Sequence, residues 1–372
     1  MSKRILHIAD LHTGIHTHGS VDPDTGVNTR SLELMSSFKW LIDLAEDLAP
    51  DAIVLGGDDA HGRTLIGTDA DALAGLYKAL ASIAPTVSVE GNHTAETGGK
   101  LSLCSVLADI CGVTYASSPR LVEAGGLTLQ LLPYPSRAAI EAAGWGLADA
   151  GKHMSELIAS SAARNPGLVC VGHFTVSGSR YSQEAQPLIQ SGMDFMVEAS
   201  TFDDPNVAVA LMGHIHNRQS IGKATYAGSL MTLTFGEEDQ SSKGVQLITL
   251  DGNSVNVKHY ENPESPRFLT VTVPSDSEVP DFRSMGEAKY LRIKADRQLT
   301  SQERALIAEH AADIGAKLRG IIEKPDRTMR SMGESLSHAL TDPAIVEAYC
   351  ESVGVTHVEQ LIELMQSADG EI

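Results

Sequence analysis

The stretch IADLHTGIHTHG, residues 8–19, joins an apolar run to a polar turn near the start of the 372-residue chain. Residues 4–9 have the composition of a short β-strand, and Asp10 and His12 follow where that strand should end. Carboxylate and imidazole groups are metal-ligand types, although a short His cluster can equally be a plain surface loop. Evidence from the rest of the sequence is needed to choose between a metal site and a surface loop.

Strands that end in turns recur along the chain. We expect them at residues 52–57, 86–91, 127–133, 168–172, 207–213, 245–250 and 255–260, with helices at 31–49 and 70–84 between the early ones. Strands that alternate with helices predict an α/β fold. The later strands follow one another more closely through turn-like linkers, so part of the sheet should be mixed or antiparallel.

Five of these strand ends carry metal-ligand residue types: DLH (10–12), GGDDAH (56–61), GNH (91–93), GHF (172–174) and GHIH (213–216). Because the carboxyl ends of strands in an open α/β sheet converge on one crevice, the five turns can meet. Imidazole, carboxylate and amide groups together suit manganese, iron or zinc rather than calcium. Two divalent ions about 3.5–4 Å apart, sharing one Asp, form the arrangement that cleaves phosphate esters. The seven candidate ligands are Asp10, His12, Asp58, Asn92, His173, His214 and His216.

The composition of the chain limits which partners and which cellular compartment we expect. The net charge is −20, which lowers the expectation of a nucleic-acid partner unless metal ions or a local basic patch reverse the sign. The four cysteines lack CxxC spacing, which fits a reducing compartment without a disulfide framework. There is no apolar run of about eighteen residues and no secretory signal pattern. We therefore expect a cytoplasmic protein, in a bacterium or a phage-infected host, with no membrane partner.

The composition of the chain changes near ENPESPR, residues 261–267, where proline and polar residues are concentrated. Strands are expected at 268–274 and 289–295, and a helix at 301–322, which together indicate a small second domain. A break at 323–330 leads to a tail with two amphipathic helical patterns and no Lys or Arg after Ser331. We expect domains at 1–260 and 261–325, followed by a helical tail at 331–372.

The ordered set DxH, GD, GNH, GH and GHxH resembles the calcineurin-like metallophosphoesterase family over residues 1–260. Further features resemble its SbcD-type DNA-repair nucleases: His61 three residues after Asp58, YAGSLMTLTFGEED (226–239) and SPRFLTVTV (265–273). The resemblance implies an α/β fold in four αββα layers, a β-sandwich flanked by helices. It also implies a small α/β capping, DNA-binding domain at 261–325 and a tail that engages an SbcC-type ATPase. It admits a homodimer.

The resemblance assigns roles position by position. Asp10, His12 and His216 would hold one ion, and Asn92, His173 and His214 the other, with Asp58 bridging both. His93 would protonate the leaving 3′-oxygen, and His61 would orient His93 or the DNA phosphate. The ions would most simply be Mn²⁺, with Mg²⁺, Fe²⁺ or Zn²⁺ as alternatives.

Four further positions need comment. Thr94 stands where the family usually has an acidic residue, so the acidic partner is either missing or supplied by Glu96, and Asp59 adds a carboxylate beside Asp58. His16 and His18 lie in a turn-rich segment and are expected in a solvated or substrate-facing loop rather than among the ligands.

The function that the resemblance implies is a two-metal-ion DNA nuclease, an exonuclease or endonuclease of DNA repair and recombination, working as an SbcD-like subunit with DNA and an SbcC-type ATPase as partners. Two alternatives stay open. One is a phosphatase or cyclic-nucleotide phosphodiesterase on the same fold, and the other is a non-catalytic scaffold for a recombination ATPase. The chain beyond residue 261 argues against the first, and the full ligand set with His93 argues against the second.

Overall fold

The computed structural model describes residues 2–95, 102–181, 196–238 and 242–324. The predicted tail at 331–372, Glu96 and Cys350 therefore lie outside the described residues. The chain forms two compact units, one of Met1–Leu269 with Ala288–Tyr290 and one of Thr270–Glu287 with the chain from Leu291 onward. The division of the chain into nuclease, capping and partner-binding segments stays a prediction.

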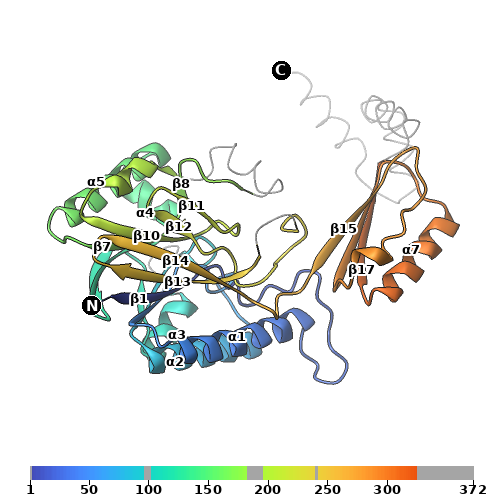
Figure 1. Ribbon diagram of the computed structural model, residues 1–372, viewed down its shortest axis with the longest axis horizontal. Helices are drawn as coiled ribbons and strands as arrows, with labels where there is room; N and C mark the ends of the chain where they lie inside the picture. The colour runs from blue at the N-terminus through green and yellow to red at the C-terminus, as the bar shows by residue number, and fades with distance from the viewer. Residues whose placement is uncertain (1, 96–101, 182–195, 239–241, 325–372) are drawn as a thin grey trace, which may run out of the picture. The chain divides into compact units, whose positions relative to one another are not determined.

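The first unit contains two six-stranded sheets (Figure 1). The first sheet has a parallel part, β1 to β4, and an antiparallel end made by β13 and β14. The second is parallel from β6 through β7 and β10 to β12, with antiparallel strands at both edges. In spatial order the first sheet is β14 (Ser254–Glu261), β13 (Gly244–Asp251), β1 (Lys3–Ile8), β2 (Ala52–Leu55), β3 (Thr86–Val89) and β4 (Thr114–Ala116). The second is β11 (Gln219–Ile221), β12 (Ala224–Tyr226), β10 (Val207–Gly213), β7 (Leu168–His173), β6 (Leu127–Leu132) and β5 (Arg120–Ala124).

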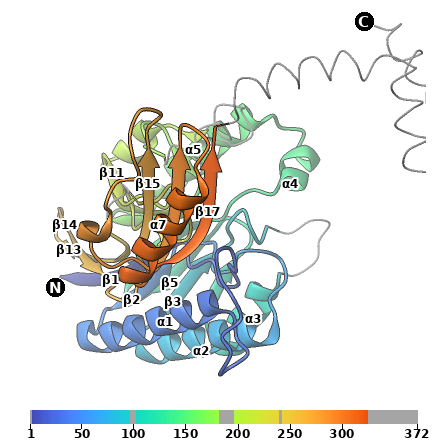
Figure 2. The ribbon, with the colours of Figure 1, turned by 90° about the vertical axis from the view of Figure 1, so that its right-hand side faces the viewer.

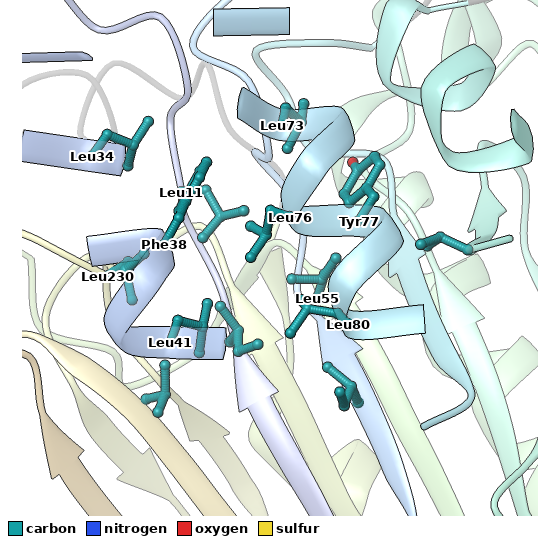
Figure 3. Packing of buried hydrophobic residues seen from close by; sticks show 14 of the residues in the cluster. Leu11, Leu34, Phe38, Leu41, Leu55, Leu73, Leu76, Tyr77, Leu80 and Leu230 are labelled. Carbon is teal, nitrogen blue, oxygen red and sulfur yellow. The ribbon is translucent and has the colours of Figure 1, made fainter. Parts of the chain in front are cut away.

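Strand residues alternate between two cores, which fixes the layer order. In β1, Ile5 packs between the sheets with residues such as Val171 and Leu211, whereas Leu6 packs under the helices. The helices α1 (Thr29–Leu48), α2 (Gly67–Ile83) and α3 (Leu103–Cys111) cover the first sheet (Figures 2 and 3). On the second sheet lie α4 (Arg137–Ala142) and α5 (Leu147–Ala162). This is the predicted α/β sandwich of two sheets flanked by helices, and central strands such as β2 (AIVL) and β10 (VAVALMG) are apolar because both of their faces are buried.

The second unit has a three-stranded sheet in the order β15 (Phe268–Val273), β16 (Tyr290–Ala295) and β17 (Lys317–Glu323), with α7 (Ser301–Asp313). The predicted helix at 301–322 is wrong in its second half. A capping box of Thr300 and Glu303 begins α7, but the helix ends at Asp313 and Gly315 takes a left-handed φ of 66° before β17. Short elements complete the described chain: β8 (Thr175–Val176), β9 (Met196–Val197), and the 3-10 turns η1 (Ala199–Asp203) and η2 (Arg283–Met285).

Two further sequence expectations can be compared with the described chain. Cys104, Cys111 and Cys170 are free thiols, in agreement with the absence of a disulfide framework. None of the helices in the described ranges combines the length and the apolar character needed to cross a bilayer.

Candidate metal centre

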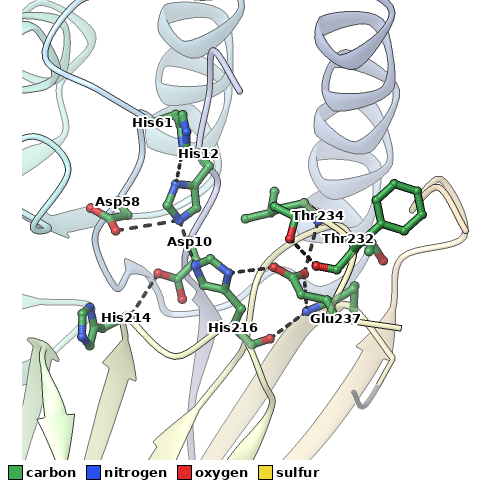
Figure 4. Close-up of polar contacts among 12 residues, drawn as sticks. Asp10, His12, Asp58, His61, His214, His216, Thr232, Thr234 and Glu237 are labelled. Atoms are coloured by element: carbon green, nitrogen blue, oxygen red, sulfur yellow. Dashed lines mark hydrogen bonds and ion pairs between the residues drawn. The ribbon is translucent and has the colours of Figure 1, made fainter. Parts of the chain in front are cut away.

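The parallel strands β1, β2, β3, β7 and β10 deliver their carboxyl-terminal residues to one place. Asp10 and His12 follow β1, and His216 follows β10. His12 Nε2 lies 3.0 Å from His216 Nε2, and these two residues form a potential metal-binding group with Asp10 (Figure 4). Asp10 Oδ1 accepts a hydrogen bond from the His214 backbone N–H at 3.0 Å, whereas the buried Oδ2 has no hydrogen-bond partner among the described residues. A buried carboxylate oxygen without a donor fits a metal ligand.

Asp58, which follows β2, lies between the two halves of the cluster. Its Oδ2 is 3.2 Å from His173 Nε2 and 3.8 Å from His12 Nε2. Burial favours the neutral carboxyl, but the imidazoles of His173 and His12 outweigh it and hold the pKa of Asp58 well below its usual range. Asp58 therefore stays ionised, as a shared metal ligand has to be.

The other half of the cluster consists of Asn92, His173 and His214. Asn92 Oδ1 lies 3.0 Å from His173 Nε2 and 2.9 Å from His214 Nδ1. The Nδ1 atom of His173 donates to the Gly56 carbonyl oxygen at 2.7 Å. A carbonyl can only accept, so Nδ1 carries the proton and Nε2 faces the cluster. All seven candidate ligands are thus brought together.

The backbone bends sharply to place these side chains. Asp10, His12, Asp58 and His214 all have positive φ, at 52°, 49°, 50° and 91°. Residues other than glycine adopt this region at an energetic cost, which is frequently found at functional sites. One close approach requires glycine itself, because a Cβ on Gly91 would lie 2.1 Å from Asp58 Oδ1.

His93 and His61 lie beside the cluster and contact each other. Their rings stack with centroids 4.9 Å apart, and His93 Nδ1 donates to the His61 carbonyl oxygen at 2.9 Å. His93 Nε2 is therefore the nitrogen left for exchange, and it lies 4.0 Å from Asp58 Oδ2. The His61 ring also reaches His12, with their Nδ1 atoms 3.0 Å apart. These two residues and His12 form a third potential metal-binding group.

Glu237 is a residue that sequence reasoning did not assign. It is buried and lies 2.9 Å from His216 Nδ1 through Oε1, and its Oε2 pairs with Lys243 at 2.9 Å. Burial favours the neutral acid, but Lys243 and His216 outweigh it and hold the pKa of Glu237 well below its usual range. A carboxylate behind a ligating imidazole fixes its tautomer and orientation. Glu237 belongs to the segment 226–239, which the sequence analysis used only as part of the resemblance to a family and not to assign a role to this residue.

Asp59, the additional carboxylate next to Asp58 in the sequence, belongs to none of the potential metal-binding groups of the described residues. It is buried and accepts hydrogen bonds from Tyr77 Oη at 2.5 Å and Ser88 Oγ at 2.6 Å. Burial raises the pKa of Asp59 to about 6, against the opposing effect of the two hydroxyl groups. Its side chain links the end of β2 to α2 and β3 rather than to a ligand.

His16 and His18 belong to no potential metal-binding group of the described residues, and both lie partly exposed in a loop that also holds them by side-chain contacts. His16 Nε2 lies 2.9 Å from Asp69 Oδ2 in α2, where Asp69 is buried. The His18 ring packs edge-on against Phe235 with centroids 4.8 Å apart. Both residues anchor the segment after β1. Thr94 is buried, and the expected replacement of its missing acid by Glu96 stays a prediction.

Comparison with known proteins shows to which protein family the chain belongs. The profile of the calcineurin-like phosphoesterase family matches residues 3–218, and the chain belongs to this family. It is accordingly a metal-dependent phosphoesterase of a fold that uses a two-metal centre, and the Asp and His cluster lies within the matched range.

Individual relatives are distant. The chain is 23% identical over 277 residues to the SbcD subunit of the nuclease SbcCD from Staphylococcus epidermidis, covering 68% of this chain and 67% of the relative. A dimetal phosphatase from Danio rerio matches at 12% identity and a TM-score of 0.44, covering 70% of this chain and 96% of that one. The sulfate thiohydrolase SoxB of Thermus thermophilus matches at 11% identity and a TM-score of 0.34, covering 69% and 56%.

Proposed function

We propose that this protein is a two-metal-ion nuclease that hydrolyses phosphodiester bonds in DNA as the SbcD-like subunit of a complex with an SbcC-type ATPase. The carrying observation is the position of Asp58, whose Oδ2 faces His173 on one side and His12 on the other. One carboxylate oxygen between two ligand groups is the arrangement that a bridged pair of ions requires. The distant likeness to an SbcCD nuclease supports the choice of DNA as substrate.

The residues divide into two binding groups. Asp10, His12 and His216 would hold one ion, Asn92, His173 and His214 the other, and Asp58 both. Once bound, such ions activate water and neutralise the phosphoryl oxygens, and Mn²⁺ suits this mixed donor set. The protein fixes the orientation of two of these imidazoles, because His173 Nδ1 contacts the Gly56 carbonyl oxygen and His216 Nδ1 contacts the Glu237 carboxylate.

His93 would act on the leaving group. Its Nδ1 proton is committed to the His61 carbonyl, so the imidazolium form carries its exchangeable proton on Nε2, on the side of Asp58. From there it would donate to the departing 3′-oxygen. His61 would hold this ring by stacking and by its backbone, and would orient His12 through the contact between their Nδ1 atoms.

One experiment tests both the substrate and the roles. Purified protein with Mn²⁺ is incubated with single-stranded DNA, linear duplex DNA and bis-p-nitrophenyl phosphate, with and without an SbcC-type ATPase. We expect Mn²⁺-dependent cleavage of DNA, an Asp58→Asn variant that binds fewer Mn²⁺ ions by calorimetry, and a His93→Ala variant that binds Mn²⁺ normally but turns over at least about a hundredfold more slowly.

Other outcomes would decide against the proposal. Hydrolysis of the small ester but never of DNA indicates a small-substrate phosphodiesterase or phosphatase. Mn²⁺ binding without any turnover indicates a scaffold. Full activity of His93→Ala would remove the role given to His93. The matched control is Val255→Ala, a change at an exposed position in β14.

A further inference from the structure

A cavity of about 940 Å³ lies in the first unit, between the start of α4, the body of α5 and the turn before β5. Its volume is in the range of pockets that bind small organic groups. The lining is mainly apolar, and three prolines, Pro119, Pro133 and Pro135, form part of its wall. Because proline has a fixed φ, the backbone of the wall has less freedom at these three positions. None of the roles proposed so far uses this cavity.

The cavity borders the metal centre on the side of Asn92 and His214. Tyr134 lines it, and the Tyr134 ring lies 6.0 Å from the His214 ring, centroid to centroid. Glu90 also lines it, and its backbone carbonyl, two residues before Asn92, accepts a hydrogen bond from the Tyr134 N–H at 2.8 Å. A substrate whose phosphate is held at the ions would therefore have its neighbouring group at the edge of this cavity.

The chemistry of the lining suits a flat aromatic group. The rings of Trp145 and His153 stack with centroids 4.1 Å apart and an interplanar angle of 21°. Trp145 is 40% exposed, so its indole keeps accessible surface although it lines the cavity. Exposed aromatic rings next to a phosphate site are the usual platform for stacking a nucleobase, and stacking tolerates any base.

The charge of the lining disfavours the phosphate part of a nucleotide. Glu90 and Glu156 contribute carboxylates, of which Glu156 also contacts His153 at 3.2 Å and Lys152 at 3.9 Å, and no Lys or Arg belongs to the lining among the residues that the structure describes. Carboxylates repel phosphate but accept hydrogen bonds from the amino groups of adenine, cytosine and guanine. The pocket and the metal cluster thus have complementary preferences, one for the base and the other for the phosphate.

We propose that this cavity is a base-binding pocket that holds the nucleobase of the nucleotide beside the scissile phosphate, with Trp145 as its stacking platform. The inference rests on the proposed phosphodiesterase function and adds to it a way of selecting nucleotides. A base enters the pocket only when it is unstacked from its neighbours. The pocket therefore favours single-stranded or frayed ends over intact duplex.

The first test compares two diesters that differ in the base. Thymidine 5′-(p-nitrophenyl phosphate) carries one, and methyl p-nitrophenyl phosphate carries none. We expect Trp145→Ala to lower the ratio of their kcat/KM values about tenfold, which corresponds to about 1.4 kcal/mol of lost stacking. Val255→Ala, at an exposed position in β14, should leave the ratio unchanged. An unchanged ratio in Trp145→Ala would overturn the pocket while leaving the diesterase function intact, whereas absence of hydrolysis of both esters would overturn the diesterase function.

The second test does not need turnover. The chain has two tryptophans, so a Trp40→Phe background leaves Trp145 as the reporter of fluorescence. With Mn²⁺ present, dAMP should quench this signal saturably and 2-deoxyribose 5-phosphate should not. An Ala139→Phe change, at an exposed position of the cavity lining, should block the quenching by filling the pocket. Equal quenching by both compounds, no quenching by dAMP, or quenching that survives Ala139→Phe would refute the proposal.

Discussion

Glu237 shows how a single side chain outside the ligand set can control the candidate metal centre. Its carboxylate lies 2.9 Å from His216 Nδ1 and is itself paired with Lys243. Substitution by glutamine keeps the size and one acceptor but removes the charge. We expect Glu237→Gln to weaken Mn²⁺ binding about 10- to 100-fold, because the imidazole loses both orientation and basicity. Isothermal titration calorimetry of the unloaded protein measures this directly.

The adjacent acid provides the control for this change. Glu238 belongs to no potential metal-binding group of the described residues, so Glu238→Gln should retain parental Mn²⁺ affinity. If both variants bound Mn²⁺ equally well, the orienting role of Glu237 would be disproved.

Residue types and spacing were sufficient to predict which seven side chains come together. Each candidate ligand lies at the end of a strand or within four residues after it, so the sheet largely determines where it lies, as for Asp58 after β2. Glu237 lies eleven residues after β12, in a segment without regular secondary structure, so periodicity gave no indication of its position. The sequence did not indicate where the Asp59 side chain points, because neighbouring residues at a turn can face opposite ways; here it is bonded to Tyr77 in α2.

At the scale of elements, the buried Asp59 carboxylate ties three of them together. It follows β2 and accepts hydrogen bonds from Tyr77 in α2 and Ser88 in β3. We expect Tyr77→Phe to lower the free energy of unfolding by about 1.5–3 kcal/mol, because a hydrogen bond to a buried acid is lost with little change in packing. Urea unfolding monitored by circular dichroism gives the value.

The exposed Ser82, also in α2, is the matched position for removal of a hydroxyl. Its Oγ donates only to the Ala79 carbonyl within the helix. Ser82→Ala should change stability by less than about 0.5 kcal/mol. A Tyr77→Phe variant as stable as Ser82→Ala would show that the tie contributes nothing.

Elements with a clear period were predicted well, and β17 shows where periodicity fails. The pattern of residues 301–322 indicates one helix, yet Gly315 ends it and the segment KLRGIIE forms an edge strand. The apolar residues of this short strand also fit a helical pattern, and only pairing with β16 resolves the ambiguity. Short strands such as β4 and β12 have too few residues to show any period.

At the scale of the whole molecule, the layer between the two sheets carries a histidine. His7 in β1 is fully buried, and burial lowers its pKa to about 4. In the unfolded chain the pKa returns to about 6.5, so the unfolded state binds the extra proton between these values. The free energy of unfolding should therefore fall as the pH drops from about 6.5 to 4, with His7 contributing up to about 3 kcal/mol of the loss.

Replacement of His7 tests this contribution. A His7→Gln variant should show a flatter decline of stability over this pH interval than the parent protein, measured by denaturant unfolding at several pH values. His153→Gln, at a position outside the two main cores, should decline like the parent. If His7→Gln declined as steeply as the parent, the acid sensitivity would have to arise elsewhere.

The α/β architecture followed from the order of strands and helices, because the connections between parallel strands leave few arrangements open. Chain length and net charge constrained it much less. The charge of −20 counted against a nucleic-acid partner, whereas the site holds a compact set of imidazoles that the total charge does not reveal. The net charge of the whole chain therefore says little about the charge at one particular site.

The four candidate ligands with left-handed backbone, Asp10, His12, Asp58 and His214, imply a balance between the stability of the fold and its function. Glycine at any of these positions would relieve strain of about 1–3 kcal/mol, so the unloaded fold would gain from losing its own ligands. Strain of this size is a stability cost of the kind that proteins keep where activity requires a particular side chain at a particular position.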